Sequence, residues 1–366
     1  MNVIFCGGGT VGHISPAIAI AEEFKKRNPD CNIAFIGRYG GSENEIIKKN
    51  GYKLYEIHVS GLIRRLTLKN LKVIKNVFTA EKEAKKILRS FKPHAVIGTG
   101  GYVCLPVVRT AKRLGIFTAI HESNASFGLT SKLLAKKCDV VFLGAKTDKE
   151  AKNMIYTGNP VREEFYKTSK NEAKKLLNIP LDTFFILSVG GSLGAERLNG
   201  ACLEMMESFS SKDTKIAHYH SCGARYYELV KQTHASFLSK NDRCKIFPYI
   251  DKMPLFLSAA DIVISRCGAM TLAETAATAT PSILIPSPNV TGDHQTKNAL
   301  YFAKNGASVI INDSELSESS LTKAVKSLMK DTTILDRMSK SARGLSSVAA
   351  SKKIVKTIEK HISEAL

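Results

Sequence analysis

The chain of 366 residues is long enough for two domains that each bury a hydrophobic core. Lys and Arg number 53 against 33 Asp and Glu, so the formal net charge is +20, and an acidic partner is expected, whether nucleic acid, membrane or substrate. Hydrophobic residues make up 44% of the chain and charged residues 23%, which excludes a disordered, collagen-like or coiled-coil protein.

The eight cysteines are scattered singly, without a CxxC pair, and most lie in apolar runs. This pattern predicts buried, reduced thiols and disfavours a zinc site or a disulfide framework. The opening segment MNVIFCGGGT lacks the basic and long apolar regions of a signal peptide, and no window approaches about 20 consecutive apolar residues. We therefore expect a cytoplasmic chain, with any membrane contact peripheral.

In the first half of the chain, short apolar segments alternate with helical ones. Strands are predicted at residues 2–6, 32–36, 52–57, 95–98, 117–120 and 140–143. The first strand leads into a glycine-rich turn and a helix over about residues 15–27, with Pro16 in its first turn. This alternation predicts a parallel, doubly wound sheet.

The second half repeats the pattern after a break at GNPVR, residues 158–162. Strands are predicted at residues 183–189, 216–219, 244–247, 262–264, 282–285 and 308–311, and the last 50 residues are predicted to be helical. The expected fold class is therefore α/β, with two Rossmann-like, doubly wound domains that face a cleft. The carboxyl ends of the strands at that cleft form the default site.

Most of the positive charge lies in the first half of the chain. Residues 1–160 hold 26 basic and 12 acidic residues, a net +14, whereas residues 161–366 hold 27 and 21, a net +6. Within residues 61–92, ten Lys or Arg are interleaved with apolar side chains between Leu62 and Phe78. On pattern alone, a helix with a solvated basic face is favoured over an interfacial site for an anionic membrane. Nucleic acid is the weaker partner, because Trp, RNP-like aromatics and zinc-finger spacing do not occur.

A glycine-rich turn and a histidine follow the first strand. Gly7, Gly9 and Gly12 match the G-x-G-x-x-G pattern of dinucleotide-binding folds. However, Arg38 ends the second strand where an acidic residue would hold the ribose, so NAD is disfavoured. His13 stands at the helix start, where a neutral imidazole suits a general base. A second turn, GTGGY, is expected on the same rim, and the two turns suit a polyoxygenated acceptor.

In the second half, GGSLGAER places Ser192 and free backbone N–H groups at a helix start, which suits an anion. SRCGAMTLAE repeats this arrangement, and Glu274 lies one turn into the helix, where it either accepts both ribose hydroxyls or is a surface charge. His294 and Gln295 open a further helix, and the chain has no Asp-x-Asp triplet. We hypothesise a nucleoside diphosphate held by helix dipoles and Arg, without bridging Mg²⁺.

Over roughly residues 2–310, the chain resembles the MurG family of bacterial N-acetylglucosaminyltransferases. Eight motifs occur in that family's order, namely GGGTVGHISPAIAIA, GTGGYVCLP, HESNASFGLTSKLLAK, TGNPVR, GGSLGAERLN, YIDKMP, ADIVISRCGAMTLAE and DHQTKNA. The resemblance implies the GT-B fold, with an acceptor (lipid I) and membrane-associating domain over residues 1–160, a UDP-GlcNAc donor domain over 161–345 and a helix over 346–366 that crosses back. The implied reaction is inverting transfer of GlcNAc from UDP-GlcNAc to the MurNAc 4-hydroxyl of undecaprenyl-diphosphate-linked muramyl pentapeptide, lipid I to lipid II, without cofactor or catalytic metal.

The matching motifs also imply roles for single residues. His13 is the implied base for the attacking hydroxyl, and Glu122 and a water are the other candidates. The implied ligands of the donor diphosphate are Arg162, Ser192, Ala269, Met270 and Thr271. For the nucleoside, Ile250 is implied to bind uracil and Glu274 the ribose. For the sugar, His294 and Gln295 are implied to bind GlcNAc, and Thr10, Gly12 and Asn124 lie where the transferred sugar meets the acceptor. The implied acceptor-binding residues are Gly9, Gly100, Gly101 and Tyr102.

The chain departs from the family pattern at four positions. Val11 replaces a glycine, and a branched side chain cannot take glycine-only dihedrals, so we expect this turn to approach the acceptor diphosphate differently. Leu193 replaces a glutamine, which removes an amide that would contact the donor. Ser123 and Cys267 replace Gln and Ser. None of the four is a residue assigned to chemistry.

Two other functions remain open. Another GT-B enzyme that uses a UDP-sugar, such as a glycolipid synthase or a UDP-GlcNAc 2-epimerase, would share the fold, although HESN and DHQTKNA argue against the epimerase. A membrane-surface or nucleic-acid-binding protein without catalysis would share the charge, but His13 and Glu274 argue against it. The resemblance assigns the basic half to lipid I, so we now expect it to dock on the anionic cytoplasmic face of the inner membrane. Expected partners are UDP-GlcNAc, lipid I and cell-wall synthesis proteins, without nucleic acid.

Overall fold

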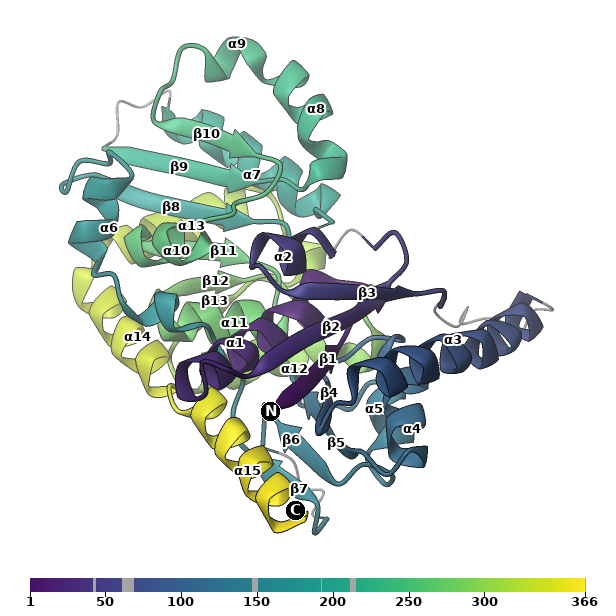
Figure 1. Ribbon diagram of the computed structural model, residues 1–366. Coiled ribbons are helices and arrows are strands. Elements are labelled where there is room, and N and C mark those ends of the chain that lie inside the picture. The colour runs from purple at the N-terminus through teal and green to yellow at the C-terminus, as the bar shows by residue number, and fades with distance from the viewer. Residues whose placement is uncertain (42–43, 61–68, 147–150, 192, 211–214, 366) are drawn as a thin grey trace. The chain divides into compact units, whose positions relative to one another are not determined.

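The computed structural model describes residues 1–41, 44–60, 69–146, 151–191, 193–210 and 215–365, which form two compact units (Figure 1). The first unit joins Met1–Arg162 to Ser347–Leu366, and the second unit is Glu163–Ser346. Each unit is built on one parallel sheet. The chain therefore completes the second unit before its last helix returns to the first.

The sheet of the first unit has the strand order β3-β2-β1-β4-β5-β6-β7. Its strands are β1 Asn2–Cys6, β2 Asn32–Arg38, β3 Lys53–Ile57, β4 Ala95–Gly98, β5 Phe117–Glu122, β6 Val140–Leu143 and β7 Met154–Tyr156. The central strands are buried on both faces, as apolar runs in a parallel sheet require. The predicted doubly wound sheet is confirmed. The sequence did not predict β7, because a three-residue strand does not stand out as an apolar run.

The helices of this unit are α1 Val11–Arg27, α2 Asn44–Lys49, α3 Lys69–Phe91, α4 Cys104–Arg113, α5 Leu129–Leu134 and α15 Ala350–Ala365. The predicted start of the first helix near residue 15 is wrong, since α1 begins at Val11. Thr10 is extended, and the His13 N–H donates to the Thr10 carbonyl at 3.1 Å, which closes the first turn early. Pro16 therefore lies inside the helix, where it removes one backbone hydrogen bond.

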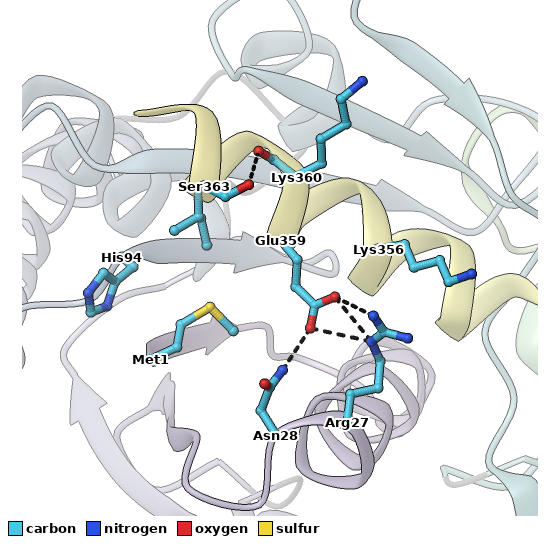
Figure 2. A pocket seen from close by; sticks show the side chains of 9 residues that line it. Met1, Arg27, Asn28, His94, Lys356, Glu359, Lys360 and Ser363 are labelled. Carbon is cyan, nitrogen blue, oxygen red and sulfur yellow. Dashed lines mark hydrogen bonds and ion pairs between the residues drawn. The ribbon is translucent and has the colours of Figure 1, made fainter. Parts of the chain in front are cut away.

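The C-terminal helix α15 covers part of one face of the first unit. Its buried side chains pack in the same core as those of β1 and α1, and they are Ile354, Val355, Ile358 and Ile362. Burying a side chain of this size contributes about 2 kcal/mol. Beside this core, the Glu359 carboxylate accepts hydrogen bonds from Arg27 and Asn28, each at 2.7 Å, as Figure 2 shows. Apolar burial and one charged cluster therefore hold α15 on the first unit.

The sheet of the second unit has the strand order β10-β9-β8-β11-β12-β13. Its strands are β8 Phe184–Val189, β9 Ile216–Ser221, β10 Cys244–Phe247, β11 Ile262–Ser265, β12 Ser282–Leu284 and β13 Ser308–Ile310. Its helices are α6 Lys170–Leu176, α7 Glu196–Ser210, α8 Ala224–Thr233, α9 Ala235–Leu238, α10 Met253–Ala259, α11 Ala269–Ala277, α12 His294–Lys304, α13 Glu318–Lys330 and α14 Thr332–Gly344, with short 3₁₀ turns η1 Glu163–Tyr166, η2 Thr291–Asp293 and η3 Asp313–Glu315. The predicted second doubly wound sheet is likewise confirmed.

In both sheets the strand order reverses between two neighbouring strands, β1 and β4 in the first unit and β8 and β11 in the second. Ligands of open parallel sheets bind outside the carboxyl ends of the strands at such a reversal. A glycine-containing turn follows each of these four strands. The topology thus brings turns that are far apart in the sequence to one edge of each sheet.

All eight cysteines are buried and free, which confirms the predicted buried thiols. Burial raises the pKa of Cys138, Cys202 and Cys267 to about 12, so these thiols stay protonated near neutral pH. Within the described ranges, no helix has the length and apolar character to cross a membrane.

Candidate active site

Two glycine-rich turns and His13 pack together at the carboxyl ends of β1 and β4. Gly100 has φ 124° and Gly101 has φ 79°, in the region that favours glycine. A Cβ atom on Gly100 would lie 2.5 Å from Cδ2 of His13, and one on Gly101 would overlap the carbonyl oxygen of Gly8. The structure thus brings together the predicted base and the predicted acceptor-binding residues, which are His13, Gly9, Gly100, Gly101 and Tyr102.

Hydrogen bonds fix both the backbone and the ring of His13. The Thr99 hydroxyl donates to the His13 carbonyl at 2.6 Å. Nδ1 of the ring lies 3.0 Å from the Gly8 carbonyl oxygen. Because a carbonyl only accepts, this contact places a hydrogen on Nδ1, so the neutral ring carries its lone pair on Nε2. That tautomer presents Nε2 as a proton acceptor.

Glu122 is buried at the end of β5, the neighbour of β4 in the sheet. One carboxylate oxygen accepts from the backbone N–H of Asn124 at 3.0 Å and from its side-chain Nδ2 at 3.1 Å. The other oxygen accepts from the N–H of Gly128 at 3.0 Å, just before α5. Both oxygens of Glu122 are therefore engaged by its own loop, and the side-chain amide of Asn124 faces Glu122.

The HESN segment is tied to the GNPVR segment through buried polar groups. Nε2 of His121 donates to the Gly158 carbonyl at 3.4 Å, and the Ser123 hydroxyl lies 3.3 Å from Nδ1. Burial lowers the pKa of His121 to about 4, so the ring is neutral and Nδ1 accepts from Ser123. Asn159 donates to the Ser123 carbonyl at 3.1 Å. Ser123, one of the four departures from the family pattern, thus has the His121 ring as its side-chain hydrogen-bond partner.

Val11 has an ordinary helical position, and its expected effect on the approach to the acceptor diphosphate stays a prediction. Val11 is the first residue of α1, and it is absent from the non-glycine residues with positive φ in the described chain. No glycine-only dihedral is needed there. Thr10 and Gly12 are exposed on either side of it, at the start of the helix. The turn therefore keeps these two predicted ligand-binding residues accessible.

In the second unit, the N-cap residue of α11 makes no side-chain capping hydrogen bond. Gly268 is the N-cap residue, and the first turn contains no acidic side chain. The three predicted phosphate-binding residues form this turn, and they are Ala269, Met270 and Thr271. Glu274 follows in the same helix and is half-buried. A helix start without acidic side chains in its first turn favours an anion.

Gln295, in the first turn of α12, joins the loops that follow β11 and β12. Its Oε1 accepts from the backbone N–H of Cys267 at 3.1 Å and from that of Ser287 at 2.9 Å. Asn298 donates to the Cys267 carbonyl at 3.1 Å. A ligand at this site would therefore meet the amide nitrogen of Gln295 rather than its oxygen. His294 is half-buried at the start of the same helix.

The remaining predicted donor-binding residues lie in different parts of the chain. Ser192 lies outside the described residues, and its neighbour Leu193 has 70% of its side chain exposed. Ile250 is buried after β10, at the edge of the sheet, with β9 and β8 between β10 and β11. Arg162 is half-buried and ends the long segment of the first unit.

Sequence reasoning missed a partly buried ion pair beside α11. Nη1 of Arg266 lies 2.6 Å from one oxygen of Asp313, and Arg197 lies 3.5 Å from the other. The same Nη1 also lies 3.4 Å from the carbonyls of Ile285 and Pro286. This network ties together the carboxyl ends of β11, β12 and β13. The available signal was an arginine directly after the apolar strand IVIS.

Comparison with known families decides between the remaining interpretations. The model of the glycosyltransferase family 28 N-terminal domain matches residues 3–143, and that of the C-terminal domain matches residues 185–359. The chain belongs to glycosyltransferase family 28. Within the described residues, no group of three or more His, Cys, Asp or Glu side chains is arranged to hold a metal.

Two relatives at 40% and 42% identity carry the same name. The chain is 40% identical over 366 residues to the "UDP-N-acetylglucosamine--N-acetylmuramyl-(pentapeptide) pyrophosphoryl-undecaprenol N-acetylglucosamine transferase" of Caldanaerobacter subterraneus subsp. tengcongensis, covering 98% of this chain and 100% of that protein. It is 42% identical over 364 residues to the protein of that name from Thermoanaerobacter sp., covering 98% and 99%. The predicted membership of the MurG family is thus confirmed.

Solved structures agree with this family 28 assignment. The crystal structure of Acinetobacter baumannii MurG superposes with a TM-score of 0.72 at 27% identity and covers 98% of this chain and 99% of that one. A UDP-N-acetylglucosamine 2-epimerase superposes with a TM-score of 0.68 at 13% identity, covering 100% and 97%. The epimerase therefore shares the fold alone, and the predicted GT-B architecture of two Rossmann-like domains is confirmed.

Proposed function

We propose that this protein transfers GlcNAc from UDP-GlcNAc to the MurNAc 4-hydroxyl of undecaprenyl-diphosphate-linked muramyl pentapeptide, converting lipid I to lipid II in peptidoglycan synthesis. The observation that carries the proposal is identity of 40% to 42%, over nearly the full length of both chains, to transferases named for this donor and acceptor. The local geometry supports a hexosyltransferase, since each unit offers polar turns at the carboxyl edge of its sheet.

In this reaction His13 is the proposed base and Glu122 a positioning residue. The Nδ1–H contact to Gly8 leaves the lone pair of His13 on Nε2, the atom needed to take the proton from the acceptor hydroxyl. As that proton moves, the hydroxyl oxygen bonds to the anomeric carbon and UDP leaves with the bonding pair. Both carboxylate oxygens of Glu122 already accept N–H bonds from its loop, so Glu122 is better placed to hold Asn124 than to remove a proton.

The second unit is the proposed donor domain. The first turn of α11, with the positive end of the helix dipole, would stabilise the diphosphate together with Arg162 and Ser192 as negative charge grows on the departing UDP. Glu274 would accept hydrogen bonds from the ribose. Because backbone dipoles and an arginine supply this positive potential, we propose that transfer requires neither a metal nor a cofactor.

We also propose that the first unit docks peripherally on the anionic cytoplasmic face of the inner membrane, where lipid I would be reached. Residues 61–68 of the predicted basic segment lie outside the described residues, but Phe78 on α3 is 61% exposed. Leu129 and Leu133 on α5 are 58% and 46% exposed, and Lys132 lies exposed between them. Apolar side chains flanked by basic ones are typical of interfacial helices. Cell-wall synthesis proteins are proposed partners at the same surface.

A discontinuous assay with two acceptor conditions tests this function. The chain is given UDP-GlcNAc in EDTA, with or without a short-chain lipid I analogue, and both UDP and the nucleotide sugars are quantified. We expect UDP to form only with lipid I present. UDP formation that requires added Mg²⁺ would refute the proposal that transfer needs no metal. Conversion of UDP-GlcNAc to its 2-epimer without acceptor would support the epimerase instead.

A further inference from the structure

A chain of buried polar side chains, none of which has been given a role above, runs through the second unit. The Ser188 hydroxyl on β8 lies 2.7 Å from Nε2 of His218 and 2.7 Å from Nδ1 of His220, both on β9. Nε2 of His220 lies 3.1 Å from Oδ1 of Asn199 on α7, and Nδ2 of Asn199 lies 2.9 Å from the Cys222 carbonyl. All four side chains are at most 3% exposed.

The Cys222 carbonyl at one end and the two neutral rings fix the direction of the hydrogen bonds in this chain. The Cys222 carbonyl only accepts, so Asn199 faces it with Nδ2 and faces His220 with its oxygen. Nε2 of His220 must therefore carry a hydrogen. Burial lowers the pKa of His220 to about 4 and that of His218 to about 3, so both rings are neutral at pH 7. Nδ1 of His220 then accepts from Ser188, whose oxygen accepts from His218.

The far end of this chain holds two loops against each other. The Gly190 N–H donates to the Ser221 carbonyl at 2.9 Å. A Cβ atom on Gly190 would lie 2.9 Å from Oδ1 of Asn199, and one on Gly194 would overlap the Cys222 carbonyl oxygen that Asn199 holds. The turn after β8 and the loop after β9 are therefore interlocked. A displaced Asn199 side chain would collide with one loop or release the other.

We propose that Ser188, His220 and Asn199 are positioning residues for the donor site, and that their hydrogen bonds hold Gly190 and Gly194, two described residues of the proposed diphosphate-binding turn, against the loop after β9. This inference rests on the proposed function, which gives the turn its ligand. The three side chains are too deeply buried to touch a nucleotide, so they act through the turn. Nδ1 of His218, at one end of the chain of side chains, has no hydrogen-bond partner among the described residues, whereas the bonds that join Ser188, His220 and Asn199 are made. A satisfied buried network of this kind favours one geometry over its neighbours.

Paired substitutions at His220 test the inference. In His220→Leu, Asn199 loses its donor, and we expect the KM for UDP-GlcNAc to rise about tenfold while the KM for the lipid I analogue changes by less than about twofold. In His220→Gln, a side-chain amide again donates toward Asn199, so most of the donor affinity should return. Ser188→Ala should lie between the two. The matched control is His234→Leu, which removes another histidine of the second unit, whose Nδ1 lies 2.7 Å from Glu207.

UDP affinity measured by calorimetry on the same variants separates this inference from the proposed function. A wild-type chain that binds UDP but transfers no GlcNAc would refute the function, while weaker UDP binding by His220→Leu would still support the positioning role. Unchanged UDP affinity in a folded His220→Leu protein would overturn the positioning role. Equal changes in donor and acceptor KM, or no recovery with Gln, would also overturn it.

Discussion

Acidification should destabilise the second unit through its two buried histidines. Burial lowers the pKa of His218 to about 3 and that of His220 to about 4, from 6.5 in an exposed ring. At pH 5 the unfolded chain therefore binds a proton at each ring that the folded chain does not. Stability is then present above pH 6.5 and is lost as the pH falls toward the folded-state values.

The magnitude follows from the gap between the exposed-ring pKa and the test pH. With a pKa of 6.5 in the unfolded chain, protonation of each ring at pH 5 lowers the free energy of unfolding by about 2 kcal/mol. The loss is about 4 kcal/mol for His218 and His220 together. Hydrogen exchange of the β8 and β9 amides between pH 7 and pH 5, corrected for intrinsic rates, measures this loss in the second unit alone.

A double variant, His218→Gln with His220→Gln, isolates the histidine contribution from that of other titrating groups. Its free energy of local unfolding should fall by about 4 kcal/mol less than that of the wild type over the same pH range. If wild type and variant lose equal stability, the two rings do not stay neutral in the fold and the directed hydrogen-bond chain is wrong.

Four further substitutions test the packing of the glycine-rich turns, the contact of α15, the proposed membrane surface and the proposed donor site. Gly101→Ala should abolish transfer, because the added Cβ would overlap the Gly8 carbonyl oxygen. The control Gly200→Ala adds a Cβ in open space and should keep activity. An active Gly101→Ala variant would contradict the packing of the two turns. Glu359→Ala should lower the free energy of unfolding of the first unit by about 1 kcal/mol in urea denaturation, since Arg27 and Asn28 lose their partner. An unchanged free energy of unfolding would show that this cluster does not stabilise the unit. Leu133→Asp should weaken binding to anionic vesicles in a flotation assay, and unchanged flotation would remove α5 from the docking surface. Glu274→Ala should raise the KM for UDP-GlcNAc with the fold intact, and an unchanged KM would leave Glu274 a surface charge.

The sequence predicted both sheets because parallel strands are nearly continuous apolar runs, and glycine-rich turns mark where those runs end. It also grouped His13 with Gly100 and Gly101, since the carboxyl ends of neighbouring strands meet at one edge. The fold alone did not separate a transferase from an epimerase, because both fit the same architecture.

The sequence could not predict contacts that depend on tertiary packing. The helix start at Val11 depends on the extended backbone of Thr10, which no residue pattern specified. Ser188 and His220 are 32 positions apart, and their hydrogen bond exists because β8 and β9 pair in one register. The loop contacts of Glu122 likewise follow from how the chain turns after β5, so its motif could not distinguish a base from a residue that holds a loop.

Product analysis of a single transfer reaction tests the central claim most directly. The wild-type chain and a His13→Ala variant are each given UDP-GlcNAc and a short-chain lipid I analogue in EDTA, and the lipid product is analysed by mass spectrometry and NMR. We predict that the wild type adds one GlcNAc in β linkage to the MurNAc 4-hydroxyl, and that the variant does so on the order of 100-fold more slowly. An unmodified lipid, or an α linkage, would contradict inverting transfer to lipid I, and a variant as fast as wild type would remove His13 as the base.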